Sequence, residues 1–175
     1  SGNLSELLTA QYSFLNADLA KHYGVTGPMG PAYERVDMPG RAGVLTQGML
    51  LSHDKPTRTS IVRRGLKVRL DLLCEKVPAP PNNVQLNLEA LGTGLTQRER
   101  LEKHRTDAAC SGCHNLMDPL GVVFEGFDAV GRARTLGEGG KAVDTSSSIS
   151  ATRDMDSPVA VAAEVGQALA NSQEV

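Results

Sequence analysis

Residues 108–121 read Ala-Ala-Cys-Ser-Gly-Cys-His-Asn-Leu-Met-Asp-Pro-Leu-Gly and contain the pattern C-x-x-C-H. This pattern is the attachment signature of a c-type haem. Two thiols one helical turn apart can add to the two vinyl groups on one porphyrin edge, and the histidine that follows can bind the iron. Cysteine and histidine are scarce, with three and four copies among 175 residues, so chance does not readily explain the match. We predict haem c attached covalently through Cys110 and Cys113, with His114 as an axial ligand.

The ligand on the other face of the iron is a separate question. Met117 follows His114 by three residues on the same expected helical turn, so we expect it on the His114 side of the haem. His104 lies six residues before Cys110 on a neighbouring predicted helix, which a turn at 106–107 can fold over the porphyrin. We therefore take His104 as the candidate second metal ligand, and an open, five-coordinate iron is the alternative.

The same cysteines and histidine allow two other chemistries. They supply three possible zinc ligands, with Cys74 or His104 as a fourth, but zinc sites favour two separated ligand pairs and His114 directly follows Cys113. A C-x-x-C pair can also act as a redox dithiol or close a small disulfide. No βαβ pattern surrounds this pair, so we keep a structural role, through zinc or a disulfide, as the alternative to haem.

A set of charged side chains follows the motif: Asp118, Glu125, Asp128, Arg132 and Arg134. We interpret Asp118 and Asp128 as residues that cap turns and form ion pairs. We hypothesise that Arg132 and Arg134 bind the haem propionates, since guanidinium groups match carboxylates in geometry. The earlier cluster over 58–65 reads as the solvated face of a helix.

Helical periodicity dominates the rest of the chain. Apolar residues and end signals predict helices over these ranges: 4–23, 41–53, 60–75, 97–105 and 158–170. Thr96 and Glu99 form a capping-box pattern at the start of one of them. Gly, Pro and Ser predict loops over 24–40, 82–95 and 131–157. We therefore predict a mainly α fold with extensive loops, in which a small cytochrome-c-like helical haem segment follows a preceding helical segment.

Charge and hydropathy exclude some classes of function. The net charge is −2 and no run of Lys or Arg is present, so we expect no nucleic-acid partner. No apolar stretch approaches the ~18 residues of a membrane span. Haem c is attached outside the bacterial cytoplasm, so the motif predicts a periplasmic or cell-surface location. We expect as partners a redox protein and other domains of the same longer chain.

Several further motifs are shared with one family: 12–24, 41–47, 58–60, 64–65, 78–84, 100–105, 118–121, 127–131 and 143–145. With the C-x-x-C-H pattern, they make the chain resemble a large family of extracytoplasmic bacterial proteins of unknown function. That family is abundant in planctomycetes and myxobacteria and is built from serial domains that carry a c-type haem motif. Its pattern includes a histidine at the position of His104. The resemblance implies a haem and a compartment, but no substrate.

The resemblance also predicts how the chain is divided. We expect 1–24 to be the carboxyl-terminal helix of a preceding domain and 25–135 to be a helical core domain that includes the haem-motif segment, 96–135. Residues 136–175 would be the truncated start of a following domain. The expected function is haem binding and electron transfer in a larger extracytoplasmic protein. A structural or binding module, or a peroxidase-like or oxygenase-like enzyme, is the alternative, so enzymatic activity stays open.

Overall fold

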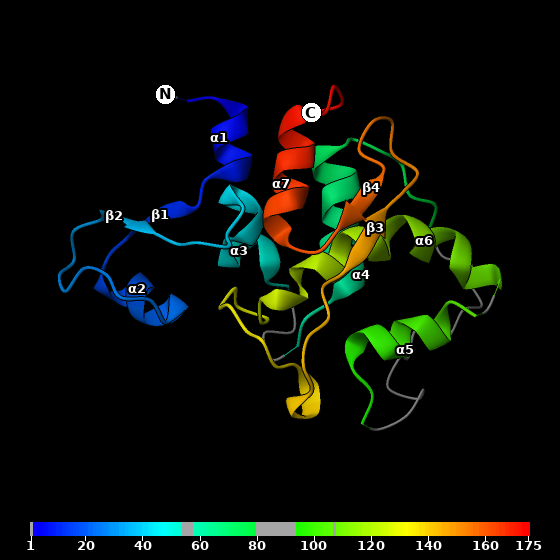
Figure 1. Ribbon diagram of the computed structural model, residues 1–175, viewed down its shortest axis with the longest axis horizontal. Helices are drawn as coiled ribbons and strands as arrows, with labels where there is room; N and C mark the ends of the chain where they lie inside the picture. Colours follow the sequence, from blue (N-terminus) through cyan, green and yellow to red (C-terminus); the bar gives the residue numbers. More distant parts are fainter. Residues whose placement is uncertain (1, 54–57, 80–93, 107) are drawn as a thin grey trace.

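The computed structural model describes residues 2–53, 58–79, 94–106 and 108–175 (Figure 1). Its elements, in chain order, are α1 (Leu4–Thr9), β1 (Tyr12–Leu15), α2 (Ala17–Tyr23), β2 (Glu34–Asp37), η1 (Gly43–Thr46), α3 (Gly48–Leu51), α4 (Ile61–Lys67), η2 (Val68–Leu72), α5 (Gln97–His104), α6 (Ala108–Val122), η4 (Val123–Gly126), η5 (Glu138–Gly140), β3 (Ser147–Ile149), β4 (Ser157–Val159) and α7 (Ala162–Asn171). The turns η1, η4 and η5 are 3-10 helix, and η2 is a turn of π-helix that continues α4. The loop predicted over 82–95 lies almost wholly outside the described residues.

The prediction of a mainly α fold is wrong, because the chain folds as a mixed α/β structure with two small antiparallel sheets. Strand β1 pairs with β2, with Tyr12 opposite Asp37, and β3 pairs with β4, with Ser148 opposite Pro158. Each sheet has two strands, so both strands are edges, and an edge accommodates the proline of β4. The sheets flank a helical centre (Figure 1).

The predicted helix over 4–23 is instead a helix, a strand and a second helix. Helix α1 ends at Thr9, and Asn16 begins α2 as an N-cap, because its side chain accepts a hydrogen bond from the backbone amide of Leu19. The predicted helix over 158–170 also starts late. Pro158 belongs to β4, and α7 begins at Ala162. In both cases a polar or proline residue that fits a helix start also fits an extended strand end.

Helix α6 carries the C-x-x-C-H segment and is longer than expected. It runs from Ala108 to Val122 and includes Pro119, a residue type that commonly ends a helix. Proline has no N–H, so Pro119 leaves the carbonyl of Asn115, four residues before it, without a helical donor. The next carbonyl oxygen, that of Leu116, accepts a hydrogen bond from Nε of Arg69 of η2 at 2.9 Å.

Helices α4 and α6 cross in close contact through two glycines. A Cβ atom on Gly65 would overlap the carbonyl of Met117, and a Cβ atom on Gly121 would overlap the carbonyl of Ile61. Each glycine therefore lies directly against the backbone of the other helix. Only glycine lacks the Cβ atom that this approach excludes.

The three segments into which we predicted the chain would divide, 1–24, 25–135 and 136–175, contribute side chains to one apolar core. Leu8 of α1, Leu120 of α6 and Leu169 of α7 are fully buried members of the same cluster. Helices α1 and α7 pack side by side (Figure 1). The division of the chain into three domains stays a prediction, but within the described residues the segments are packed together.

Replacing Gly121 with alanine should lower the free energy of unfolding by about 3 kcal/mol or more, since the added methyl must force α4 and α6 apart. Gly112→Ala is the matched control, because it lies in the same helix and its Cβ would meet no atom within 4 Å. Alanine there should instead raise stability by roughly 1 kcal/mol through its helix propensity. Urea unfolding followed by circular dichroism measures both. Equal midpoints for Gly121→Ala and the parent would contradict the close crossing.

Candidate functional site on helix α6

Helix α6 places the three predicted haem-binding residues on adjacent positions of one turn. Cys110 and His114 are four residues apart and therefore on the same face, and Cys113 is beside them. Cys110 and His114 are buried, and Cys113 is partly exposed. Neither thiol is in a disulfide, and the Cys113 thiol contacts the carbonyl oxygen of Pro78 at 3.7 Å. Two thiols and an imidazole are thus brought together on a structured helix.

His114 is held by a buried carboxylate one turn further along α6. Its Nδ1 lies 3.0 and 3.1 Å from the two carboxylate oxygens of Asp118, whose exposed fraction is 1%. An ionised carboxylate only accepts, so Nδ1 is the donor. Among the described residues, Nε2 of His114 has no hydrogen-bond partner. The ring therefore keeps its Nε2 lone pair available for a metal.

Asp118 is the site residue whose role sequence reasoning missed. We expected it to cap a turn, but it lies inside α6 and is hydrogen-bonded to the predicted ligand. Its spacing of four residues from His114 is the signal that reveals the pair once a continuous helix is assumed. Pro119 hid that signal, because it suggested that the helix had ended.

His104 lies next to His114. The two rings meet edge to face, with centroids 4.9 Å apart and planes at 80°. Helix α5, which carries His104, lies beside α6 at the edge of the molecule (Figure 1). Met117 is buried three residues after His114 on α6, as its spacing indicates. The structure thus brings both predicted metal ligands together, in direct ring contact.

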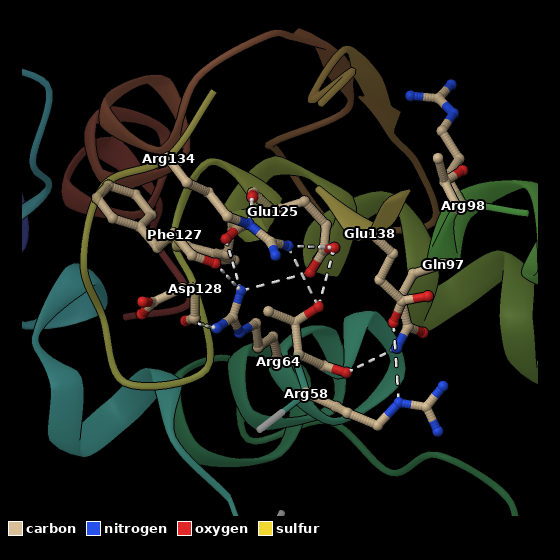
Figure 2. Close-up of polar contacts among 12 residues, drawn as sticks. Arg58, Arg64, Gln97, Arg98, Glu125, Phe127, Asp128, Arg134 and Glu138 are labelled. Atoms are coloured by element: carbon tan, nitrogen blue, oxygen red, sulfur yellow. Dashed lines mark hydrogen bonds and ion pairs between the residues drawn. The ribbon is translucent and has the colours of Figure 1, made fainter. Parts of the chain in front are cut away.

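Arg134 lies in a second cluster, built on a buried carboxylate. Its Nη2 lies 2.8 Å from Oε2 of Glu125, and its Nε donates to the Glu125 carbonyl. Thr59 donates to the same carboxylate at 3.0 Å, and Arg64 lies 3.4 Å from its other oxygen. Figure 2 shows Arg64 of α4, Glu125 of η4 and Arg134 of the segment after η4 pointing toward one another.

Arg64 is the most heavily bonded member of this cluster. Its guanidinium donates to the carbonyl oxygens of Phe124 at 2.6 Å, Phe127 at 2.9 Å and Asp128 at 2.5 Å (Figure 2). Burial lowers the pKa of Arg64 to about 10, so the group stays protonated at neutral pH. Burial also raises the pKa of Glu125 above its ordinary value, against the opposing effect of Arg134 and Arg64. The cluster fixes the chain that follows α6.

The expectation that residues 58–65 form a solvated face is wrong for Thr59 and Arg64, which are both buried. Arg64 adjoins Gly65 in sequence, and the Gly65 contact brings this part of α4 directly onto α6. A charged side chain at such a crossing must find partners inside the protein, and here backbone carbonyls supply them.

Arg132 is exposed, and its Nε donates to the carbonyl oxygen of His22. Asp128 caps the same loop, as expected, because its Oδ1 accepts from the amides of Val130 and Arg132 at 2.9 Å. Both predicted propionate partners, Arg132 and Arg134, are therefore bonded to other groups in this structure.

Arg100 is a third arginine, which sequence reasoning did not select. It is buried on α5, and its Nη1 lies 2.7 Å from Oε2 of Glu138. Its Nε is buried with no hydrogen-bond partner among the described residues. Arg100 precedes His104 by four residues, so both lie on one face of α5.

The fold and the site define a mixed α/β domain with two thiols and a buried, carboxylate-bound imidazole on one helix. A family model described as PSCyt3, protein of unknown function (DUF1588), matches residues 41–137. This match covers more than half of the chain, which therefore belongs to that family. No curated protein and no solved structure matches the chain. Membership of a family of unknown function is thus confirmed, and the bacterial origin and the haem stay predictions.

Replacing Arg64 with methionine should lower the free energy of unfolding by about 3–5 kcal/mol, because four carbonyls and Glu125 lose a buried cation. Arg63→Met is the matched control, since Arg63 is the exposed neighbour on α4 and a surface change should stay within about 0.5 kcal/mol. Chemical denaturation of both variants decides the matter. An equal loss of unfolding free energy in Arg64→Met and Arg63→Met would show that the buried network is not what stabilises the fold.

Proposed function

We propose that this protein is a c-type cytochrome-like module that binds one haem through Cys110 and Cys113, with His114 on the iron. The observation that supports this most is the placing of all three residues on one turn of α6, with His114 already oriented by Asp118. The family name, PSCyt3, agrees with a cytochrome-related module. When bound, the haem supplies one-electron redox chemistry, and the protein supplies ligands, orientation and burial.

His104 remains our candidate for the second ligand. Two imidazoles on opposite sides of one iron are separated by the macrocycle, so they cannot keep the edge-to-face contact seen here. The proposal therefore requires α5 to move away from His114 when haem binds. If α5 stays, the iron keeps one open position.

We propose Arg100 as the first partner of a haem propionate, ahead of Arg132 and Arg134. Its buried Nε has no hydrogen-bond partner among the described residues, whereas Arg134 is committed to Glu125. It also shares a face of α5 with His104, whose ring contacts His114. A buried guanidinium with an unused donor is suited to a carboxylate.

We place this module outside the cytoplasm, in the periplasm or on the cell surface, because that is where haem c is attached. Its proposed partners are a redox protein and other domains of the same longer chain. Among the described residues, no helix is long and apolar enough to cross a membrane.

Protein made with haem-maturation machinery should show sharp reduced α and β bands, and the haem should stay attached after denaturation. Cys110→Ala should lose one of the two thioether bonds, which the absorption spectrum of the denatured haem detects. Cys74→Ala is the matched control, because Cys74 is an exposed thiol outside the motif. Absence of covalent haem in the parent, where a known c-type cytochrome is loaded in parallel, would overturn the proposal. Zinc bound in its place would support the structural alternative.

Arg100→Gln should lower the reduction potential of the loaded protein, because loss of a positive charge beside a propionate favours ferric iron. Arg98→Gln is the control, since Arg98 is on the same helix and pairs with Glu102 and Asp144 at the surface. Potentiometric titration gives both values. An unchanged potential in Arg100→Gln would exclude Arg100 as a propionate partner.

A further inference from the structure

We propose that Asp118 is the positioning residue of the His114 ligand and that it stabilises the ferric state of the iron relative to the ferrous state. This inference rests on the proposed function for its redox part, but its first part concerns the protein alone. Asp118 touches no cofactor atom; it acts through the imidazole ring of His114.

The geometry fixes which tautomer His114 adopts. Nδ1 lies almost equally far from the two carboxylate oxygens, 3.0 and 3.1 Å, so the hydrogen on Nδ1 has an acceptor in either direction. A neutral imidazole carries one hydrogen, and here that hydrogen is on Nδ1. Nε2 is then left as the lone-pair nitrogen. Among the described residues, no other acceptor is bonded to Nδ1, so without Asp118 neither tautomer would be favoured over the other.

The carboxylate cannot easily move away from the ring. Asp118 and His114 are one turn apart on the same helix. Three residues after Asp118, Gly121 lies against the backbone of α4, which anchors this turn of α6. The pair is therefore built into the helix crossing, and its position does not depend on a loop.

The burial of Asp118 links this carboxylate to a metal on His114. Its exposed fraction is 1%, and among the described residues His114 is its one hydrogen-bond donor. A buried carboxylate with a single neutral donor is poorly compensated. A cation on Nε2 withdraws electron density from the ring and makes the Nδ1–H a stronger donor. Metal on Nε2 and charge on Asp118 therefore stabilise each other.

The same coupling predicts the sign of a redox effect. A strong carboxylate acceptor gives the imidazole partial imidazolate character and raises its basicity as a ligand. Ferric iron carries one more positive charge than ferrous iron and gains more from that basicity. Asp118 should therefore lower the reduction potential of the haem.

The tautomer can be tested in haem-free protein by NMR of the ¹⁵N-labelled histidines at about pH 9, well above the ordinary pKa of imidazole, roughly 6.5. In the parent, His114 should show a protonated Nδ1 and a lone-pair Nε2. Asp118→Ala should give a mixture of tautomers. A parent ring protonated mainly on Nε2, or no change in Asp118→Ala, would overturn the inference whether or not haem is ever bound.

The redox effect must be measured on the haem-bound protein, with a variant whose side chain has the same shape as that of Asp118. Asp118→Asn keeps an oxygen acceptor but removes the charge, so covalent haem should still attach while the ferric form loses about tenfold in relative stability. For one electron that is an upward shift of about 59 mV. Leu120→Val, a change of packing in the same turn, should leave the potential in place. Haem attached in Asp118→Asn with an unchanged potential would overturn the redox part and leave the proposed function intact.

Discussion

The contact between Gly65 of α4 and Gly121 of α6 is the constraint on which the rest of the structure depends. It brings two helix backbones so close that no side chain fits between them. Because of this approach, Arg64 beside the crossing reaches the carbonyls after α6, and Arg69 one turn later reaches the carbonyl of Leu116 inside α6. The stretch of α6 that carries Asp118 and His114 is fixed from the same crossing. A sulfur and nitrogen site is thus mounted on the most tightly packed element of the fold.

Three of the buried arginines, Arg41, Arg64 and Arg69, hold irregular segments through bonds to backbone carbonyls. Arg41 donates to the carbonyls of Thr46 and Gly131, and its guanidinium stacks between the rings of Tyr23 and Phe127. Arg64 donates hydrogen bonds to carbonyls in the turn after α6, and Arg69 donates to the carbonyls of Leu116, Ser150 and Ala151. All three lie inside the family match, 41–137. Only 3% of the residues are aromatic, so few large apolar side chains are available to pack against the loops. Each of these guanidinium groups instead holds a loop by several hydrogen bonds to backbone carbonyls.

The signals that predicted structure correctly are local. The capping box of Thr96 and Glu99 begins α5 as expected, because both halves of the motif act within one turn. The failures involve partners distant in the chain. The pairing of β1 with β2 depends on residues up to Asp37, so the leucine spacing within 4–23 did not reveal that the first helix ends at Thr9. Arg64 was predicted to be solvated because three of its carbonyl partners lie 60 or more residues away in the chain and the fourth, Leu51, lies 13 away.

The sequence by itself determined the chemical groups and their spacing: Cys110, Cys113 and His114 lie within one turn because five consecutive residues of a helix leave no other arrangement. Only the tertiary structure decided what surrounds them. The crossing of α4 and α6 anchors the part of α6 that follows the His114–Asp118 pair, and the packing of α5 brings His104 onto the His114 ring. Spacing is a property of covalent geometry, whereas burial, partners and charge come from segments that meet only on folding.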